Sequence, residues 1–330
     1  MSHASRTLRV LTTSAAAGAL FLAAPLAAPA KPAVSELRVE AGGQALAPGH
    51  RYVTNTVRLR TDTTPACGGT GKPVTVKGPT AVGLVDHARR VEPALRPYRV
   101  SDKFDFGLLV CGIGEFVGSD TAFWLYKVDH VSPEVGGDQF ALDDGDEVLW
   151  YFQDTERGIN TGEELELRAP ARARPGEPFT VTAFRYDAAG KRRRAAGAEI
   201  AGGQNVATTD AKGRATLGAG DAGTLTLRAT RGPAIASEPI DVCVNEVLGQ
   251  CPAVRGERIL GRSGADSITG TPGADEVRAR GGDDTIDVTG NERDRVLCGA
   301  GDDTVRADRR DRVARDCETV RRPTRSAAGG

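Results

Sequence analysis

The sequence predicts a mainly β, multidomain protein that ends in a parallel solenoid, and three observations predict it. A nine-residue pattern recurs from Gly261 to Val313, and short alternating strands separated by Gly and Pro turns precede it. Of the sixteen Phe, Trp and Tyr residues, twelve lie between Tyr52 and Phe152, and none follows Tyr186. Because the last part of the chain has no large side chain to bury, we expect stacking, disulfides or metal to stabilise it.

Residues 1 to 30 have the features of a secretory signal peptide. Arg6 and Arg9 precede an apolar, alanine-rich run, and Ala-Pro-Ala at residues 28 to 30 offers a cleavage site. No second apolar run of spanning length follows. We therefore expect a secreted protein, extracellular or loosely associated with the cell surface, with no membrane span. The formal net charge of −1 argues against nucleic acid as a partner.

Residues 34 to 154 form the first predicted domain. The stretches 34–40 and 53–60 alternate apolar and polar residues as half-buried strands do, and a Gly-rich turn precedes a strand at 74–77. A helix is predicted to begin after the N-cap Thr80 and to end at Pro93 and Pro97, with its apolar stripe at Leu84, Ala88, Val91 and Leu95. Strong strand patterns follow, so the domain is of the α+β kind.

Motifs in the second half of this domain resemble the transcobalamin-like C-terminal domain, a β-grasp module of bacterial surface proteins. They are Cys111-Gly112-Ile113-Gly114, Trp124-x-Tyr126-x-Val128 and Gly145-Asp146-x-Val148-x-Trp150. The resemblance implies a β-grasp-like α+β domain. It does not imply cobalamin binding, because the helical barrel that closes over the vitamin in carrier relatives is missing here. Asp129-His130 stands where the family has an Asn-Gly turn, so that turn must be built differently.

The aromatic residues of these motifs are the candidate site for a small, cofactor-type ligand. Trp124, Tyr126 and Trp150 have rings that could stack on a flat ligand or a sugar. Their alternate positions along strands favour a packing role instead.

Residues 163 to 243 are predicted to form an all-β sandwich. Strand patterns recur at about ten-residue spacing, at 164–168, 179–186, 198–200, 207–209, 215–217, 224–229 and 240–244. The stretch VATTDAKGRATL resembles the hairpin of bacterial Ig-like repeats, which implies an Ig-like β-sandwich. We interpret the basic run Lys191 to Arg194 as a solvated loop, with a contact to anionic cell-wall polymers as the alternative. Residues 244 to 257 would be a disulfide-pinned linker.

The six cysteines, an even number in a chain that we expect to be exported, indicate three disulfides. Fifteen pairings are possible in principle. Proximity in the sequence favours Cys67–Cys111, Cys243–Cys251 and Cys298–Cys317.

The nine-residue pattern defines the last predicted domain, residues 258 to 320, before a disordered tail at 321 to 330. Aligned in register, one column holds only aspartate, with Ile or Val two residues later, and its members are Asp266, Asp275, Asp284, Asp294, Asp303 and Asp311. One Gly-rich turn and one short β-branched strand per repeat predict a solenoid.

The repeat resembles the haemolysin-type (RTX) calcium-binding nonapeptide G-G-x-G-x-D-x-U-x, which implies a parallel β-roll with calcium as its cofactor. In that family calcium lies between one turn and the next but one, held by carboxylate and carbonyl oxygens. Carried onto this chain, Asp266, Asp284 and Asp303 would line one side, and Asp275, Asp294 and Asp311 the other. The matching glycines are Gly261, Gly264, Gly270, Gly273, Gly282 and Gly301.

The match is incomplete, which leaves an alternative open. Asn291 and Arg310 replace glycine, and the array is rich in arginine. The alternative is a degenerate roll held by Asp–Arg pairs and a disulfide, with little affinity for calcium.

No Gly-x-Ser-x-Gly, His-Glu-x-x-His, phosphate-binding glycine loop or Cys-x-x-Cys occurs, so we do not expect an enzyme. The sequence predicts a secreted, calcium-binding modular protein with a recognition or adhesion role toward an unidentified cell-surface or extracellular ligand. One alternative is a structural extracellular or matrix protein with a calcium-independent roll. Another is small-molecule binding by the β-grasp domain.

Overall fold

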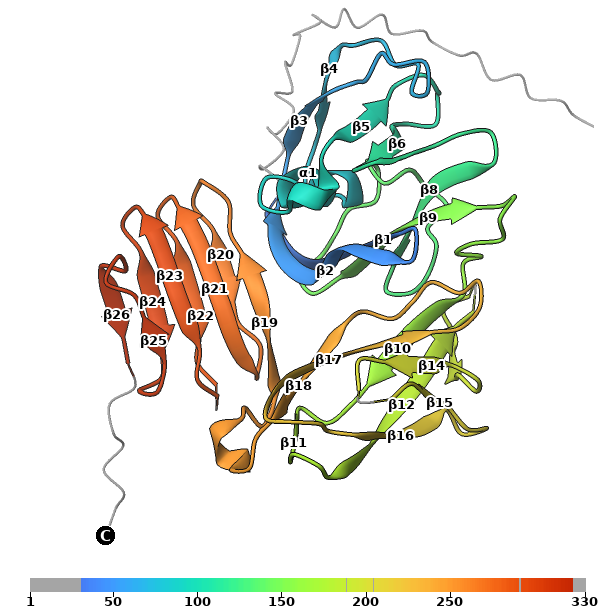
Figure 1. The fold of residues 1–330 in the computed structure, drawn as a ribbon. Coiled ribbons are helices and arrows are strands. Elements are labelled where there is room, and N and C mark those ends of the chain that lie inside the picture. Colours follow the sequence, from blue (N-terminus) through green and yellow to red (C-terminus); the bar gives the residue numbers. More distant parts are fainter. Residues whose placement is uncertain (1–30, 188, 204, 291, 323–330) are drawn as a thin grey trace, which may run out of the picture.

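The computed structural model describes residues 31–187, 189–203, 205–290 and 292–322. The protein is mainly β, with 47% strand and 5% helix. Figure 1 shows three regions: the N-terminal region in blue to green, a sandwich in yellow-green below it, and a solenoid in orange and red beside both. The predicted signal peptide, and the part of the predicted tail from residue 323 onward, lie outside the described residues.

The N-terminal region is built on a sheet in which two strands far apart in sequence run parallel. β1 (Ala33–Ala41) pairs antiparallel with β2 (Gln44–Thr54) and parallel with β9 (Glu147–Asp154), and β9 pairs antiparallel with β8 (Ala122–Val128). Two smaller sheets accompany it. They contain β3 (Val57–Arg60) and β4 (Pro73–Val76), and β5 (Tyr98–Ser101), β6 (Leu109–Ile113) and β7 (Phe116–Val117).

The helix α1 (Ala81–Ala88) packs on this sheet with all of its residues buried. Its N-cap is the predicted one, because the backbone N–H of Gly83 donates to Oγ1 of Thr80 at 3.1 Å. The helix ends earlier than predicted, and Leu95 lies instead in the 3₁₀ turn η1 (Pro93–Leu95). Proline disfavours helical backbone at the preceding residue, and Glu92 is indeed extended.

The sandwich consists of two sheets around a core of small and branched aliphatic side chains. One sheet holds β10 (Glu164–Arg168), β12 (Pro178–Tyr186), β13 (Arg192–Arg194) and β16 (Arg214–Gly218). The other has the order β11 (Arg172–Ala173), β18 (Ile240–Val244), β17 (Gly223–Thr230), β14 (Glu199–Ala201) and β15 (Ala207–Thr208).

The basic run in the sandwich forms a strand rather than the loop that we predicted, although Lys191, Arg193 and Arg194 are exposed as expected. Three of its four residues form β13, which pairs antiparallel with β12. The guanidinium of Arg192 lies 3.4 Å from the ring centre of Phe184, and that of Arg194 lies 4.4 Å from it. The Nε of Arg192 also lies 2.8 Å from the carboxylate of Glu166. Stacking on the aromatic ring and this ion pair together hold the run in a strand.

The solenoid has two parallel sheets that enclose a narrow aliphatic interior. One sheet contains β19 (Arg255–Leu260), β21 (Ala274–Gly281), β23 (Arg295–Ala300) and β25 (Arg312–Val313). The other contains β20 (Ser267–Thr269), β22 (Thr285–Val288), β24 (Thr304–Ala307) and β26 (Thr319–Arg321). The predicted Ile and Val positions point inward, and the solenoid of about 3 turns fits a β-roll.

The first sheet of the solenoid continues into the N-terminal region. β19 pairs parallel with β2, with Ile259 opposite Arg51 and Leu260 opposite Tyr52. The result is one eight-stranded sheet in the order β25-β23-β21-β19-β2-β1-β9-β8. Val34 and Val53 of the N-terminal region belong to the solenoid's own apolar cluster.

Three disulfides join Cys67 to Cys111, Cys243 to Cys251 and Cys298 to Cys317, which are the pairings that proximity in the sequence favours. The short 3₁₀ turn η2 (Leu248–Gln250) lies within the loop that the second disulfide closes. Within the described parts of the chain, no helix has the length and apolar character needed to cross a membrane.

Candidate metal centre

The repeated aspartates lie in two columns, one along each side of the solenoid. The first column holds Asp266, Asp284 and Asp303, and the second holds Asp275, Asp294 and Asp311. All six residues are buried, with exposed fractions between 1% and 6%. Carboxylates are seldom buried so completely unless they bind a cation or are fully hydrogen-bonded.

Within the first column, the carboxylates of Asp284 and Asp303 each accept a hydrogen bond from the backbone of the coil before. The N–H of Asp266 donates to Oδ1 of Asp284 at 2.8 Å, and the N–H of Asp284 donates to Oδ1 of Asp303 at 2.9 Å. The column ends at Glu318, whose Oε2 accepts the N–H of Asp303 at 2.8 Å.

The second column repeats this arrangement. The N–H groups of Glu257, Asp275 and Asp294 donate to Oδ1 of Asp275, Asp294 and Asp311 at 2.8, 2.7 and 3.1 Å. Hydrogen bonds to one carboxylate oxygen therefore tie consecutive coils together on both sides of the solenoid.

The second carboxylate oxygen of the first column is not satisfied in the same way. Oδ2 of Asp284 and Oδ2 of Asp303 are buried, and neither has a hydrogen-bond partner in the part of the chain that the structure describes. Asp266 differs, because its Oδ2 accepts the backbone N–H of Arg262 at 2.6 Å and its Oδ1 lies 2.7 Å from the Arg262 guanidinium. Two neighbouring coils thus present buried oxygens that a cation would satisfy.

The burial of these carboxylates also shifts their titration. Burial raises the pKa of Asp284 to about 7, and the charges of Asp266 and Asp303 add to the shift. Burial likewise raises the pKa of Asp294 to about 6, with Asp311 and Asp275 adding to it. Both columns therefore favour a proton or a cation near neutral pH.

Glycine is required where the turns of the first column stack. Gly282 and Gly301 have φ angles of +101° and +144°, which side chains rarely adopt. A Cβ on Gly282 would overlap the backbone of Gly264, and one on Gly301 would overlap the carbonyl of Gly282. Among the other predicted glycine positions, a Cβ on Gly261, Gly270 or Gly273 would also be too close to its neighbours, whereas a Cβ on Gly264 would meet nothing within 4 Å.

These residues fit calcium in their chemistry, because buried carboxylates and backbone carbonyls are the hard oxygen ligands that it prefers. Across the described ranges, no three His, Cys, Asp or Glu side chains converge on one point. An ion in either column would therefore take carbonyl oxygens of the turns in addition to carboxylates from two coils.

The arginines of the array lie mostly outside the columns. Among the column aspartates in the described structure, Asp266 alone forms an ion pair with arginine. Arg278 pairs with Glu276 at 2.6 Å and Arg306 with Asp287 at 2.8 Å, both on the outer surface. The Asp–Arg pairing of the alternative interpretation is thus found at the first coil.

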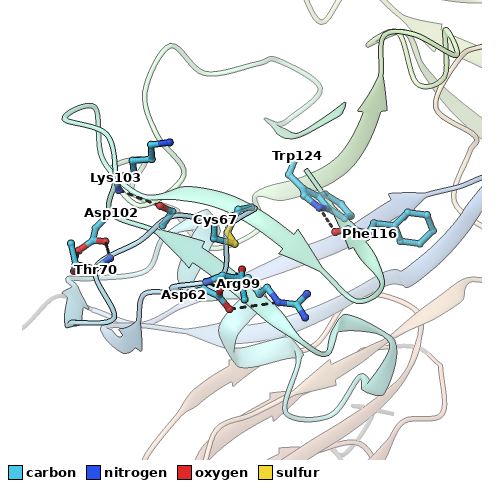
Figure 2. Close-up of a disulfide and its surroundings, with 11 residues drawn as sticks. Asp62, Cys67, Thr70, Arg99, Asp102, Lys103, Phe116 and Trp124 are labelled. Carbon is cyan, nitrogen blue, oxygen red and sulfur yellow. Dashed lines mark hydrogen bonds and ion pairs between the residues drawn. A yellow bond between two sulfur atoms is a disulfide. The ribbon is translucent and has the colours of Figure 1, made fainter. Parts of the chain in front are cut away.

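The aromatic residues proposed as a ligand platform belong to the core of the N-terminal region. Trp124 and Trp150 are 4% and 3% exposed, and their indole N–H groups donate to carbonyls of Phe116 at 3.0 Å and Ala81 at 3.2 Å. Figure 2 shows Trp124 directed at Phe116, near the disulfide of Cys67. Tyr126 stacks on Trp150 with ring centres 5.0 Å apart. Core packing rather than ligand stacking therefore explains the two indoles.

Two residues that contact the solenoid turns were missed in the sequence. Glu318 ends the first column, and the signal was present, because Glu318-Thr319-Val320 repeats the Asp303-Thr304-Val305 pattern. His87 of α1 is buried with Nε2 3.2 Å from the carbonyl oxygen of Gly261, so the helix contacts the first turn of the solenoid. No local pattern marks that contact.

Comparison with known families gives two matches. The model of the RTX calcium-binding nonapeptide repeat (4 copies) matches residues 260–291, and a domain of unknown function, DUF4430, matches residues 108–154. No curated protein and no solved structure matches the chain. The RTX nonapeptide repeat family binds calcium. The residues matched by the repeat model include the first three nine-residue repeats and Asp284, whose Oδ2 is unpartnered.

Proposed function

We propose that the protein is a secreted, calcium-binding modular protein without catalytic activity, in which calcium binds in the aspartate columns of the β-roll. The observation that carries the proposal is the pair of buried, unpartnered oxygens, Oδ2 of Asp284 and Oδ2 of Asp303. The family match supports it, since RTX calcium-binding repeats suggest a calcium-binding, non-catalytic modular protein.

In this proposal the residues of each column have separate tasks. In Asp284 and Asp303, one carboxylate oxygen joins two coils through a backbone N–H, and the other faces the cation. Glycine at positions such as Gly282 lets the turns approach closely enough for carbonyl oxygens to complete the ligand set. Calcium, when bound, cancels the repulsion between the stacked carboxylates. Extracellular calcium modules bind with dissociation constants of roughly 10⁻⁴ to 10⁻³ M, and we expect this range.

We further propose that the regions upstream of the roll serve recognition or adhesion. A helix on a mixed sheet supports a β-grasp-like N-terminal domain, and the two packed sheets of the second region support an Ig-like spacer. One observation favours a recognition role for the N-terminal region. Phe104 and Phe106 are 42% and 57% exposed, and their rings stack with centres 5.1 Å apart, which is an unusual amount of aromatic surface to leave in water.

A second candidate function is that of a structural extracellular protein whose roll folds without calcium. The hydrogen-bond ladders of the columns and the disulfide between Cys298 and Cys317 favour it, because both join coils without a metal. In that case the aspartates would act only as hydrogen-bond acceptors.

An isosteric substitution separates the two candidates. In Asp284→Asn the side-chain carbonyl can still accept the N–H of Asp266, but the charge that calcium needs is gone. We expect calcium to raise the melting temperature of the native chain, and the substitution to remove most of that increase. The control Asp302→Asn changes an exposed neighbour outside the columns and should leave the calcium response intact.

The measurement is thermal unfolding of the full chain by circular dichroism, in calcium and in chelator. A native chain with the same melting temperature in both would refute calcium binding and leave the structural role.

A further inference from the structure

The outer face of the solenoid's first sheet is a concentrated arginine surface. Its registers place Arg258, Glu276, Arg295 and Arg312 in one row across β19, β21, β23 and β25. Arg278 and Arg280 follow on the same face of β21, because side chains alternate along a strand and Val277 and Ala279 point inward. We call these five arginines the arginine face. It contains Arg258, Arg278, Arg280, Arg295 and Arg312.

The second sheet of the same solenoid is different. Its outward positions form a row of hydroxyl side chains, Ser267, Thr285, Thr304 and Thr319. A second row pairs Asp287 with Arg306, followed by Arg321. The arginine bias is thus a property of one face and does not follow from the repeat itself.

Little negative charge opposes the arginine face. Glu276 lies on it and pairs with Arg278 at 2.6 Å, and Arg278, Arg258 and Arg295 lower its pKa, although its partial burial opposes the shift. Glu92 of the N-terminal region lies near its edge, where the hydrogen bond with His50 and the charge of Arg258 lower the pKa of that carboxyl. Arg278, Arg280, Arg295 and Arg312 are exposed. Neighbouring strands lie about 4.8 Å apart, so the backbones of the paired Arg295 and Arg312 lie at nearly that spacing.

The arginine face lies on the same side of the shared sheet as the helix α1. Leu260 and Tyr52, which are opposite each other in that sheet, point to the side that α1 covers, and Arg258 points the same way as Leu260. Arg89 and Arg90 at the end of the helix pair with Asp86 at 2.6 and 2.9 Å, so they add little net charge to the arginine face.

The net charge of the whole chain conceals this surface. The formal value of −1 counts the six column aspartates, which are buried inside the roll. A partner at the surface meets the exposed arginines much more directly than the enclosed carboxylates, because water and salt screen the longer distances.

We propose that the arginine face binds an anionic polysaccharide that carries sulfate or phosphate groups along its chain. Planar guanidinium groups form paired hydrogen bonds with such groups, and a flat sheet with regularly spaced charges suits a linear, repetitive partner. Nucleic acid fits less well, because no aromatic residue follows Tyr186 and the face has no ring on which a base could stack. The proposal does not depend on calcium binding.

The test compares two double variants of the full chain that lose the same charge. Arg295→Gln with Arg312→Gln removes two neighbours of the arginine face, and Arg306→Gln with Arg321→Gln removes two exposed arginines of the other sheet. The probe is fluorescently labelled dextran sulfate at low salt, with calcium present. We expect the first pair to weaken binding roughly thirtyfold, since an arginine near an anionic surface contributes about fivefold. The second pair should change it less than about twofold.

Every other result would overturn the proposal. Equal losses in both double variants would indicate a general charge effect rather than a binding face. No binding of dextran sulfate by the native chain would exclude it outright. Double-stranded DNA bound as tightly as dextran sulfate, with the same dependence on Arg295 and Arg312, would assign the face to nucleic acid. Thermal unfolding of each variant checks that the roll remains folded.

Discussion

The two ends of the solenoid are closed by different means. At its N-terminal end, β19 pairs with β2, and Val34 and Val53 complete the apolar interior. At its C-terminal end, no further domain covers β25 and β26 among the described residues, and the disulfide of Cys298 and Cys317 joins the last coils. The first end thus depends on tertiary packing, and the second on a covalent bond. A repeat array needs such caps because each coil is stabilised only by its neighbours.

The largest effect should come from removing the covalent cap. Cys298→Ser with Cys317→Ser opens a loop with a sequence separation of 19 residues. The loop-entropy account predicts a loss of about 3 kcal/mol in the free energy of unfolding. Urea denaturation, followed by circular dichroism, measures it. A loss confined to the last coils, with β19 still protected from hydrogen exchange, would show that the two caps act independently.

Weakening the other cap should cost somewhat less. Val53 of β2 is fully buried against the roll, and Val53→Ala leaves a cavity there. We expect the free energy of unfolding to fall by about 2 kcal/mol. Because the sheet is shared, the N-terminal region and the roll should unfold in one transition. Two separate transitions by calorimetry would contradict a common sheet.

The third prediction concerns the columns between the caps. The folded-state pKa of Asp284 is raised to about 7 and that of Asp294 to about 6, so the folded chain binds protons more tightly there than the unfolded chain does. In chelator, this contribution to stability is fully present below about pH 4 and is lost as the pH rises through 6 and 7. Calcium should reverse the trend, since it binds the ionised carboxylates.

Melting temperatures at pH 5 and pH 7.5, with and without calcium, test the direction of this pH dependence. The variant Asp284→Asn cannot ionise and should show a weaker pH dependence in chelator. A native chain that becomes more stable toward pH 7.5 in chelator would rule out the raised pKa values of the column aspartates as the origin of the pH dependence.

The smallest loss of stability should come from breaking an ion pair at the N-terminal cap of the solenoid. Arg51 of β2 pairs with Glu257 of β19, and their side chains are 23% and 31% exposed. Partly solvated pairs contribute little, so Glu257→Gln should lower the free energy of unfolding by less than about 1 kcal/mol. A loss as large as that of Val53→Ala would mean that charge, and not packing, joins the two regions.

The repeat made much of the candidate site predictable. A nine-residue period fixes which aspartates share a side of the roll, and the structure has Asp266, Asp284 and Asp303 on one side. The contacts between regions were not predictable, because the pairing of Ile259 with Arg51 joins distant segments and has no local pattern. The alternation around Trp124 and Trp150 indicated strands, but it did not indicate how completely the smaller sheets and α1 would cover both rings.

The shared sheet also sets an order for assembly. β2 is made long before the roll, and β19 is the first solenoid strand to be made and the one that pairs with it. Only that first pairing must close a long loop, which is the costly step for strands far apart in sequence. Every later coil is added beside a coil that is already in place. The solenoid should therefore grow in the direction of synthesis, away from the N-terminal region, and the disulfide that fastens its last coils should be the final bond to form.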